Sequence, residues 1–285
     1  MNTIRRSYAI FVESLRVLAK DKEILIFPFL SGIITILAFV SMVFAGVTSG
    51  LLREFQSGNR LLGYVVLFVW YFVSWFIVLF FNVAVVECAS IRLKGGDPTI
   101  ADGFRASMQH LGRIIAWALI SATVGVILRA IADRSKLIGR IIVGLLGAAW
   151  SIATYFIVPV MIFEKRSIGD SVKQSTSLIR KTWGESLVAA GGIGAFIMLL
   201  ALAGLVLPVV AFFFSATAAL VALGVLVVYW IGLSVVSAAL SGIFRTALYL
   251  YATEGRSPAG FTPEYVQHAF AVKQKGATNF SFGTR

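Results

Sequence analysis

Five uncharged, apolar stretches dominate the sequence and restrict the folds open to it. They cover residues 24–52, 61–86, 114–128, 141–163 and 186–244. A helix needs roughly 20 apolar residues to cross the hydrocarbon core of a bilayer. With 59% hydrophobic and 13% charged residues, a soluble domain of 285 residues would have too few polar side chains for its surface. We therefore expect an integral membrane protein.

The stretches predict six transmembrane helices and an all-α membrane fold. The first four supply one helix each, and the short third one extends to about residues 112–132 because Arg113 and Arg129 can snorkel outward. The last is long enough for two crossings. We expect their turn between Leu207 and Leu223, where Pro208 breaks the helical hydrogen-bond ladder. Six crossings place both termini on one side.

The distribution of basic residues assigns that side to the cytoplasm. All but six of the 25 Lys and Arg residues lie on the side of the termini, as expected for a protein of the cell (inner) membrane. The net charge of +12 needs no nucleic-acid partner, and it would attract anionic lipid headgroups at roughly 1 kcal/mol per basic residue. The six on the opposite side are Arg53, Arg60, Arg129, Arg134, Lys136 and Arg140.

A weak internal repeat precedes the first, third and fifth spans. On a helix, its apolar positions share one face, as in an amphipathic helix lying at the membrane interface. Asp97 before Pro98, and Ser167 before Ile168, provide helix-start signals for the second and third copies. The copies are Phe11-x-x-Ser14-x-x-x-Leu18-x-Lys20, Phe104-x-x-Ser107-x-x-x-Leu111-x-Arg113 and Val172-x-x-Ser175-x-x-x-Ile179-x-Lys181.

The repeat predicts three parallel hairpins in one polytopic domain, each preceded by a cytoplasmic amphipathic helix. The units are residues 2–93, 97–166 and 167–255, followed by a cytoplasmic tail, 256–285. All three copies start in the cytoplasm, which favours a compact, pseudo-threefold bundle over the inverted repeats of many transporters. Chance similarity among amphipathic segments is the alternative explanation.

Two ionisable residues within the spans form a candidate site. Glu87 and Arg245 lie near the cytoplasmic ends of the second and sixth helices, at depths that would allow an ion pair. Ser234, Ser237 and Ser241 continue the Arg245 face of the sixth helix at helical spacing. The stripe is either the wall of a polar substrate or ion path, or a surface of small residues for tight helix packing.

Residues that would carry catalysis or bind a metal or cofactor are not grouped in this sequence. The two histidines, His110 and His268, lie far apart, and the single cysteine, Cys88, falls next to an apolar run. An enzyme needs convergent acid, base or nucleophile groups. We therefore expect no enzymatic activity, catalytic residue, metal or cofactor.

Several segments together resemble a known family. They are DKEILIFPFLSG at 21–32, GGDPTIADG at 95–103, GRIIAWALISATVGVILRAI at 112–131 and TWGES at 182–186. The chain is similar, over essentially its whole length, to a prokaryotic family of six-helix integral membrane proteins of unknown function. The resemblance implies the same fold and topology, and no activity or site residue.

Two functional hypotheses follow from these observations. The first is a structural or regulatory membrane component that binds lipids or partner membrane proteins. The second is a small-molecule permease or channel with a polar path along the sixth helix.

Overall fold

The structure, a computed structural model, describes residues 3–50, 60–135, 137–164, 166–181, 185–255 and 258–261. Within these ranges the chain is helical and contains no strand. Six stretches are long and apolar enough to cross a membrane, as the sequence predicted. Of the predicted tail, 256–285, all but 258–261 lies outside the described residues. The six spans are Lys22–Thr48, Leu61–Leu93, Leu111–Arg134, Leu137–Phe163, Gly194–Phe212 and Ala216–Glu254.

Long apolar helices are joined by shorter ones. A short 3-10 helix, η1 (Lys22–Leu25), leads into the first long helix. The α-helices are α1 (Thr3–Lys20), α2 (Ile26–Thr48), α4 (Arg60–Leu93), α5 (Ile100–Gln109), α6 (Leu111–Arg134), α7 (Leu137–Ala153), α8 (Ile157–Phe163), α9 (Ile168–Lys181), α10 (Glu185–Gly204), α11 (Val206–Phe212) and α12 (Ala216–Glu254).

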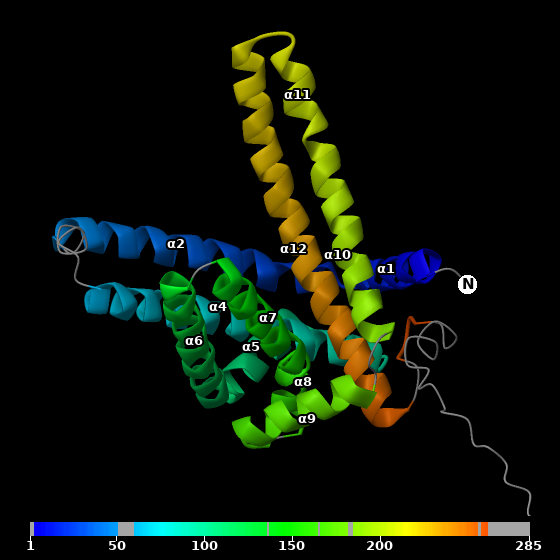
Figure 1. The fold of residues 1–285 in the computed structure, drawn as a ribbon. Coiled ribbons are helices and arrows are strands. Elements are labelled where there is room, and N and C mark those ends of the chain that lie inside the picture. Colours follow the sequence, from blue (N-terminus) through cyan, green and yellow to red (C-terminus); the bar gives the residue numbers. More distant parts are fainter. Residues whose placement is uncertain are drawn as a thin grey trace, which may run out of the picture.

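Consecutive spans pack against each other in pairs. The first hairpin is α2 with α4, the second is α6 with α7 and α8, and the third is α10 and α11 with α12. Figure 1 shows the first pair extending to the left and the third upward, whereas the second lies against the first through α6 and α4. The predicted pseudo-threefold bundle stays a prediction, because the outer end of the third pair stands apart while the first two pairs pack together.

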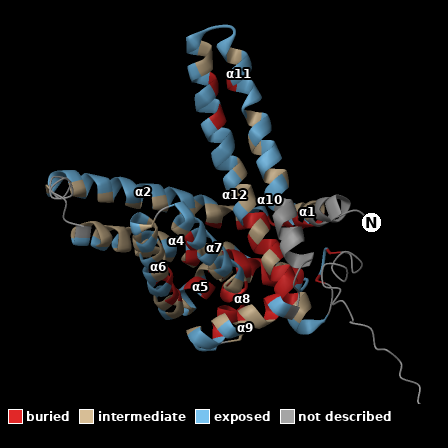
Figure 2. Cartoon of the chain, in the orientation of Figure 1, coloured by how far each residue is buried: buried red, intermediate tan, exposed pale blue. Residues whose placement is uncertain are grey.

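The buried residues gather where the hairpins meet. We call this region the core end. It contains the C-terminal ends of α4, α8 and α12 together with α1, α5 and α9. Phe27, Phe156, Met161, Leu240 and Ile243 are fully buried there. We call the opposite end of each hairpin the tip; it is mostly exposed in the third hairpin, whereas the outer half of α4 in the first is mostly half-buried (Figure 2).

The three short helices connect the hairpins in a closed cycle. Helix α5 packs against α4 of the first hairpin, and α9 packs against α7 and α8 of the second. Helix α1 packs against α10 and α12 of the third. Each short helix thus contacts the hairpin that precedes its own, and α1, at the start of the chain, contacts the last one.

Equivalent positions of the repeat make these contacts. The Phe104 ring lies 5.6 Å from that of Phe27 and 6.1 Å from that of Phe81. Phe11 of α1 stacks on Phe196 of α10, with 5.5 Å between the ring centroids. The apolar stripe predicted to lie on lipid therefore packs, at these positions, on protein; the interfacial location of the helices stays a prediction.

The serine shared by the three copies has no exposed surface in any of them. Ser14, Ser107 and Ser175 are each 0% exposed. The Ser107 hydroxyl donates to the Phe80 carbonyl oxygen of α4 at 2.7 Å. The Ser175 hydroxyl oxygen accepts the Phe156 backbone N–H at 3.1 Å, satisfying a donor at the start of α8. A small residue at this position lets the short helix approach its neighbour closely.

The helix-start signals are correct for α9 and wrong by two residues for α5. Asp170 N–H donates to the Ser167 hydroxyl at 3.2 Å, as predicted for a cap. In α5, Thr99 is the cap, and it forms a reciprocal capping box with Asp102. Asp97, the predicted cap, instead pairs with Arg92. The hydrogen bonds from Thr99 lower the pKa of Asp102, as the hydrogen bond from Ser167 lowers that of Asp170.

Pro208 lies close to the turn of the third hairpin but does not form it. The helix is interrupted at Leu205, and Pro208 is the third residue of α11. Near a helix start, a missing backbone N–H leaves no intrahelical hydrogen bond unmade. The turn itself follows Phe212 and ends at Ser215, whose hydroxyl accepts from Ala218 N–H at 3.0 Å. The turn is within the predicted window, although Pro208 is not its cause.

Gly242 sets the distance between α12 and α4. A Cβ atom at Gly242 would lie 2.4 Å from Val85 Cγ1, whereas one at Gly232 on the same helix would contact nothing within 4 Å. We expect Gly242→Val to reduce the free energy of unfolding by about 1–3 kcal/mol through overpacking. Gly232→Val is the matched control and should have no comparable effect. Thermal unfolding followed by tryptophan fluorescence in detergent would measure both, and equal midpoints would contradict the contact.

Arg92 joins the start of the first span to the end of the second. It pairs with Asp21, 7% exposed, and with Asp97, 91% exposed. Asp21→Asn should lower the free energy of unfolding by about 2–3 kcal/mol, because it leaves the guanidinium without its buried partner. Asp97→Asn should lower it by less than about 1 kcal/mol, because solvent screens an exposed pair. Denaturant titration of the two variants distinguishes these outcomes; the reverse order would show that Asp21 is not the structural partner.

Candidate functional site

The two predicted intramembrane charges occupy different surroundings. The guanidinium of Arg245 lies over the ring of Tyr155, 4.8 Å from its centroid, and its Nε has no hydrogen-bond partner. Glu87 is half-buried on α4 and lines a pocket with residues of α5 and α8. Within the described part of the chain, the ion pairs do not include one between Glu87 and Arg245.

The predicted serine stripe follows α12 toward its tip. Ser234 is exposed, and its hydroxyl donates to the Ile231 carbonyl oxygen of its own helix at 2.7 Å. Ser237 and Ser241 are half-buried. None of the three lines the pockets described below. A polar path through these residues therefore stays a prediction.

A polar pocket opens instead between α4, α5 and α8. It has a volume of about 380 Å³. Its inner wall contains the buried residues Ser90, Ala106 and Ile162, and its mouth the exposed Lys94 and Gln109. The lining is completed by Glu87, Ile91, His110 and Phe163.

The pocket joins polar groups that are distant in the sequence. Glu87, Ser90 and Lys94 share one face of α4, because their spacing of three and four residues is that of a helix. His110 is at the corner between α5 and α6, and this corner brings it to α4. Sequence reasoning considered Glu87 and His110 separately. The sequence alone shows only that the spacing from Glu87 to Lys94 places these residues on one face of a helix.

Charged side chains next to the pocket form ion pairs and hydrogen bonds that connect its helices. Lys94 Nζ lies 3.7 Å from Glu254 Oε1 at the end of α12 and 5.7 Å from the Phe163 ring centroid. Glu164, next to Phe163, pairs with Arg166 at 2.6 Å and accepts from the Tyr249 hydroxyl at 3.1 Å. These contacts fix the ends of α4, α8 and α12 relative to one another.

The Arg113 side chain binds α8, which forms one wall of the pocket. Its Nη1 donates to the Met161 carbonyl oxygen at 2.7 Å. Arg113 was expected to snorkel outward from the start of its span. It instead binds the end of α8, where a backbone carbonyl near the helix terminus has no intrahelical partner.

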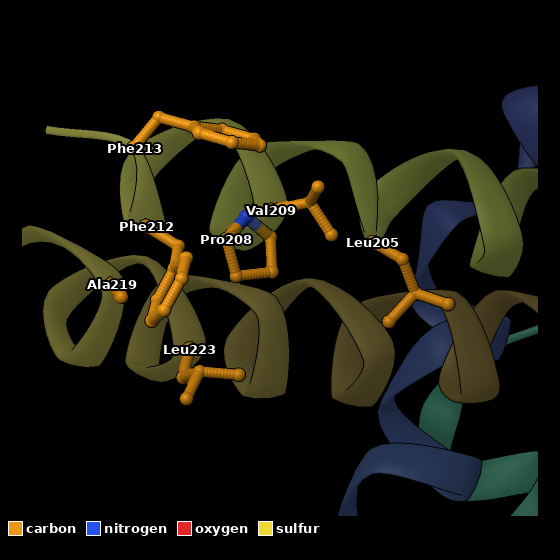
Figure 3. A pocket seen from close by; sticks show the side chains of 7 residues that line it. All are labelled: Leu205, Pro208, Val209, Phe212, Phe213, Ala219 and Leu223. Atoms are coloured by element: carbon orange, nitrogen blue, oxygen red, sulfur yellow. The ribbon is translucent and has the colours of Figure 1, made fainter. Parts of the chain in front are cut away.

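A second hollow, of about 390 Å³, lies at the tip of the third hairpin. Figure 3 shows Pro208 and Phe212 directed toward α12, where Ala219 and Leu223 face them, while Phe213 points away. The lining side chains are all apolar. In a bilayer, such a groove contacts lipid chains without any specific recognition.

A third hollow follows the exposed side of α9. It is lined by Val172, Lys173, Thr176, Ser177 and Arg180 and measures about 360 Å³. Two cations with two hydroxyl groups offer donors to an anion. Lys173 is already 3.6 Å from Asp170, so part of its charge is compensated.

Among the described residues, Cys88 and the acidic side chains do not form a metal centre. The Cys88 thiol is buried and donates to the Thr99 carbonyl oxygen at 3.5 Å. Among the described residues, no three His, Cys, Asp or Glu side chains are close enough to hold a metal ion together.

Comparisons with known proteins give a family and no function. The profile of a family of unknown function, DUF6159, matches residues 61–261, from the start of α4 to the segment after α12. The curated proteins and the solved structures contain no match to the chain. The matched region covers more than half of the sequence and includes the polar pocket. The chain therefore belongs to the DUF6159 family, a family of unknown function, and it has the six apolar helices of a multi-pass membrane protein.

Proposed function

We propose that this protein is a structural or regulatory component of the cell (inner) membrane, which binds lipids at its cytoplasmic face and partner membrane proteins along its hairpins. In this proposal the three hairpin units start in the cytoplasm, and α1, α5 and α9 lie at the cytoplasmic membrane interface. Both termini are cytoplasmic, and no catalytic activity is assigned.

The exposed apolar surface of the spans carries this proposal. In the most apolar 18-residue stretch of each span, only 6% to 28% of the residues are buried. In the third hairpin, Phe213 is 83% exposed, and large apolar side chains such as Leu202 and Val228 are also exposed. Surfaces of this kind can contact lipid chains or the helices of a partner, because helix association in a membrane depends on close packing rather than on the hydrophobic effect.

The charges at the core end support the proposed orientation. Arg105 and Lys173 are mostly exposed on the short helices, and Arg180 is exposed on α9. Basic side chains at this level are suited to the phosphates of anionic lipids, each contributing roughly 1 kcal/mol. The tip ends, in contrast, carry exposed aromatic side chains such as Phe213 and Phe214.

A permease or channel is the second candidate function. It would use Glu87, Arg245 and the serine stripe of α12, and the Arg245 Nε without a hydrogen-bond partner is the observation that favours it. A cation within a membrane span is costly and is commonly functional, although the ring of Tyr155 partly compensates this one. The exposed Ser234, bonded to its own helix, offers no further support for an enclosed path.

Site-directed labelling tests the orientation. We expect Phe214→Cys to react with a membrane-impermeant maleimide in intact cells, because Phe214 lies in the turn at the tip of the third hairpin. Arg105→Cys, on α5 at the core end, should react only after the cells are opened. The native chain gives the background, since its single cysteine is buried. Labelling of Arg105→Cys in intact cells would overturn the assignment.

Extraction in native lipid tests the function. We expect a reproducible protein partner to co-purify, and Leu202→Trp on the third hairpin to reduce its amount, because this hairpin contains the least buried span. Leu37→Trp, on the equally exposed surface of the first hairpin, is the matched control. A single monodisperse species, without a partner and with a thermal midpoint that rises on adding a solute, would favour the permease.

A further inference from the structure

Glu87 is a carboxylate that interacts with the charge of Lys94 only from a distance, along one face of α4. It makes no hydrogen bond or ion pair within the described part of the chain, whereas Asp21, Asp102 and Glu164 at the core end are all paired. Its side chain is half-buried in a span and faces the pocket between α4, α5 and α8. A charged group in this position is stabilised when a cation or a hydrogen-bond donor is bound to it. The inner part of the pocket is therefore suited to a cationic ligand group.

The mouth of the same pocket has the opposite character. Lys94 is exposed there, and its ammonium, 3.7 Å from Glu254, keeps N–H donors for a further acceptor. The neighbouring Gln109 carries an amide donor, while the buried Ser90 lies between the two ends on the inner wall. An anionic ligand group would be bound at this end.

The distance between Glu87 and Lys94 limits the length of the ligand. Glu87 and Lys94 are seven residues apart on one helix face, a rise of about 10 Å. An ethanolamine phosphate held by hydrogen bonds at both ends bridges a distance of this order. The volume of about 380 Å³ is within the range of small-ligand sites. Ile91, Ile162 and Phe163 form an apolar wall beside the polar groups, as an amphiphilic ligand requires.

We infer that this pocket binds a primary ammonium phosphate zwitterion, with the ammonium on Glu87 and the phosphate on Lys94. This chemistry is found in the headgroup of phosphatidylethanolamine and in soluble glycerophosphoethanolamine. The lipid form of the assignment rests on the proposed function, in which lipids are ligands of the core end. Because Glu87 lies deeper in the span than Lys94, a lipid headgroup would have to fold inward, with its phosphate at the cytoplasmic mouth and its ammonium within the span. Phosphatidylcholine has no N–H to donate to the carboxylate, and phosphatidylglycerol has no cation.

The test uses the full chain in nanodiscs containing equal amounts of phosphatidylethanolamine, phosphatidylcholine and phosphatidylglycerol. Lipids retained after transfer to detergent and gel filtration are quantified by mass spectrometry. We expect phosphatidylethanolamine to be enriched about tenfold over phosphatidylcholine, the effect of one charge-assisted hydrogen bond. Glu87→Gln and Lys94→Gln should each remove the enrichment. Asp133→Asn, a carboxylate-to-amide change in the exposed pair with Arg129, should preserve it.

A second arm distinguishes the lipid from the soluble source. Glycerophosphoethanolamine is added to the delipidated protein, and the thermal unfolding midpoint is measured. A rise that requires Glu87, without lipid enrichment, assigns the site to the soluble zwitterion. Equal retention of the three lipids together with no rise overturns the inference, as does enrichment that persists in both Glu87→Gln and Lys94→Gln. The proposed function fails separately, if no partner co-purifies and no lipid class is retained.

Discussion

The packing of each short helix against a neighbouring hairpin holds the three hairpins together. Helices α1, α5 and α9 contact the third, first and second hairpins respectively, so the cycle closes between the two ends of the chain. In water, such helices bury their apolar faces with a gain of about 25 cal/mol per Å². Between apolar helices within lipid this gain is absent, because lipid chains are as apolar as the side chains. The hairpins nevertheless also contact each other directly, since α4 packs against α6 and α12, and the tip of the third hairpin alone extends away in Figure 1.

The buried polar groups divide into two kinds. Most of those at the core end are paired: Asp21 with Arg92, Glu164 with Arg166 and Tyr249, and Ser107 with a backbone carbonyl. These contacts stabilise the meeting place of the hairpins. Glu87 and the Nε of Arg245 contribute no such pairing. The permease hypothesis uses both groups and the pocket proposal uses Glu87, although other buried atoms such as Ser14 Oγ and Asn82 Oδ1 also have no hydrogen bond.

The sequence predicted the spans well and the geometry of single residues less well. Long uncharged runs identify membrane helices because a charge within the hydrocarbon core is costly, and this holds whatever the neighbours are. The cap of α9 at Ser167 was likewise visible, since capping is a local interaction. Asp97 was misassigned as a cap because its partner, Arg92, competes for the carboxylate from the preceding helix. Pro208 was assigned to the turn because its missing N–H does not show where a helix resumes.

The sequence by itself indicated that the chain lies in a lipid bilayer, how many spans it has and where the three amphipathic segments lie. Hydrophobicity and helical period allow this because they are properties of local segments. Only the tertiary structure decided which hairpin each short helix contacts and that the third hairpin extends away from the other two. It also placed Glu87 in one pocket with His110 and residues of α8 rather than in a pair with Arg245. The rotation of α4 about its axis determines that placement, and this rotation is fixed by packing contacts such as Val85 against Gly242.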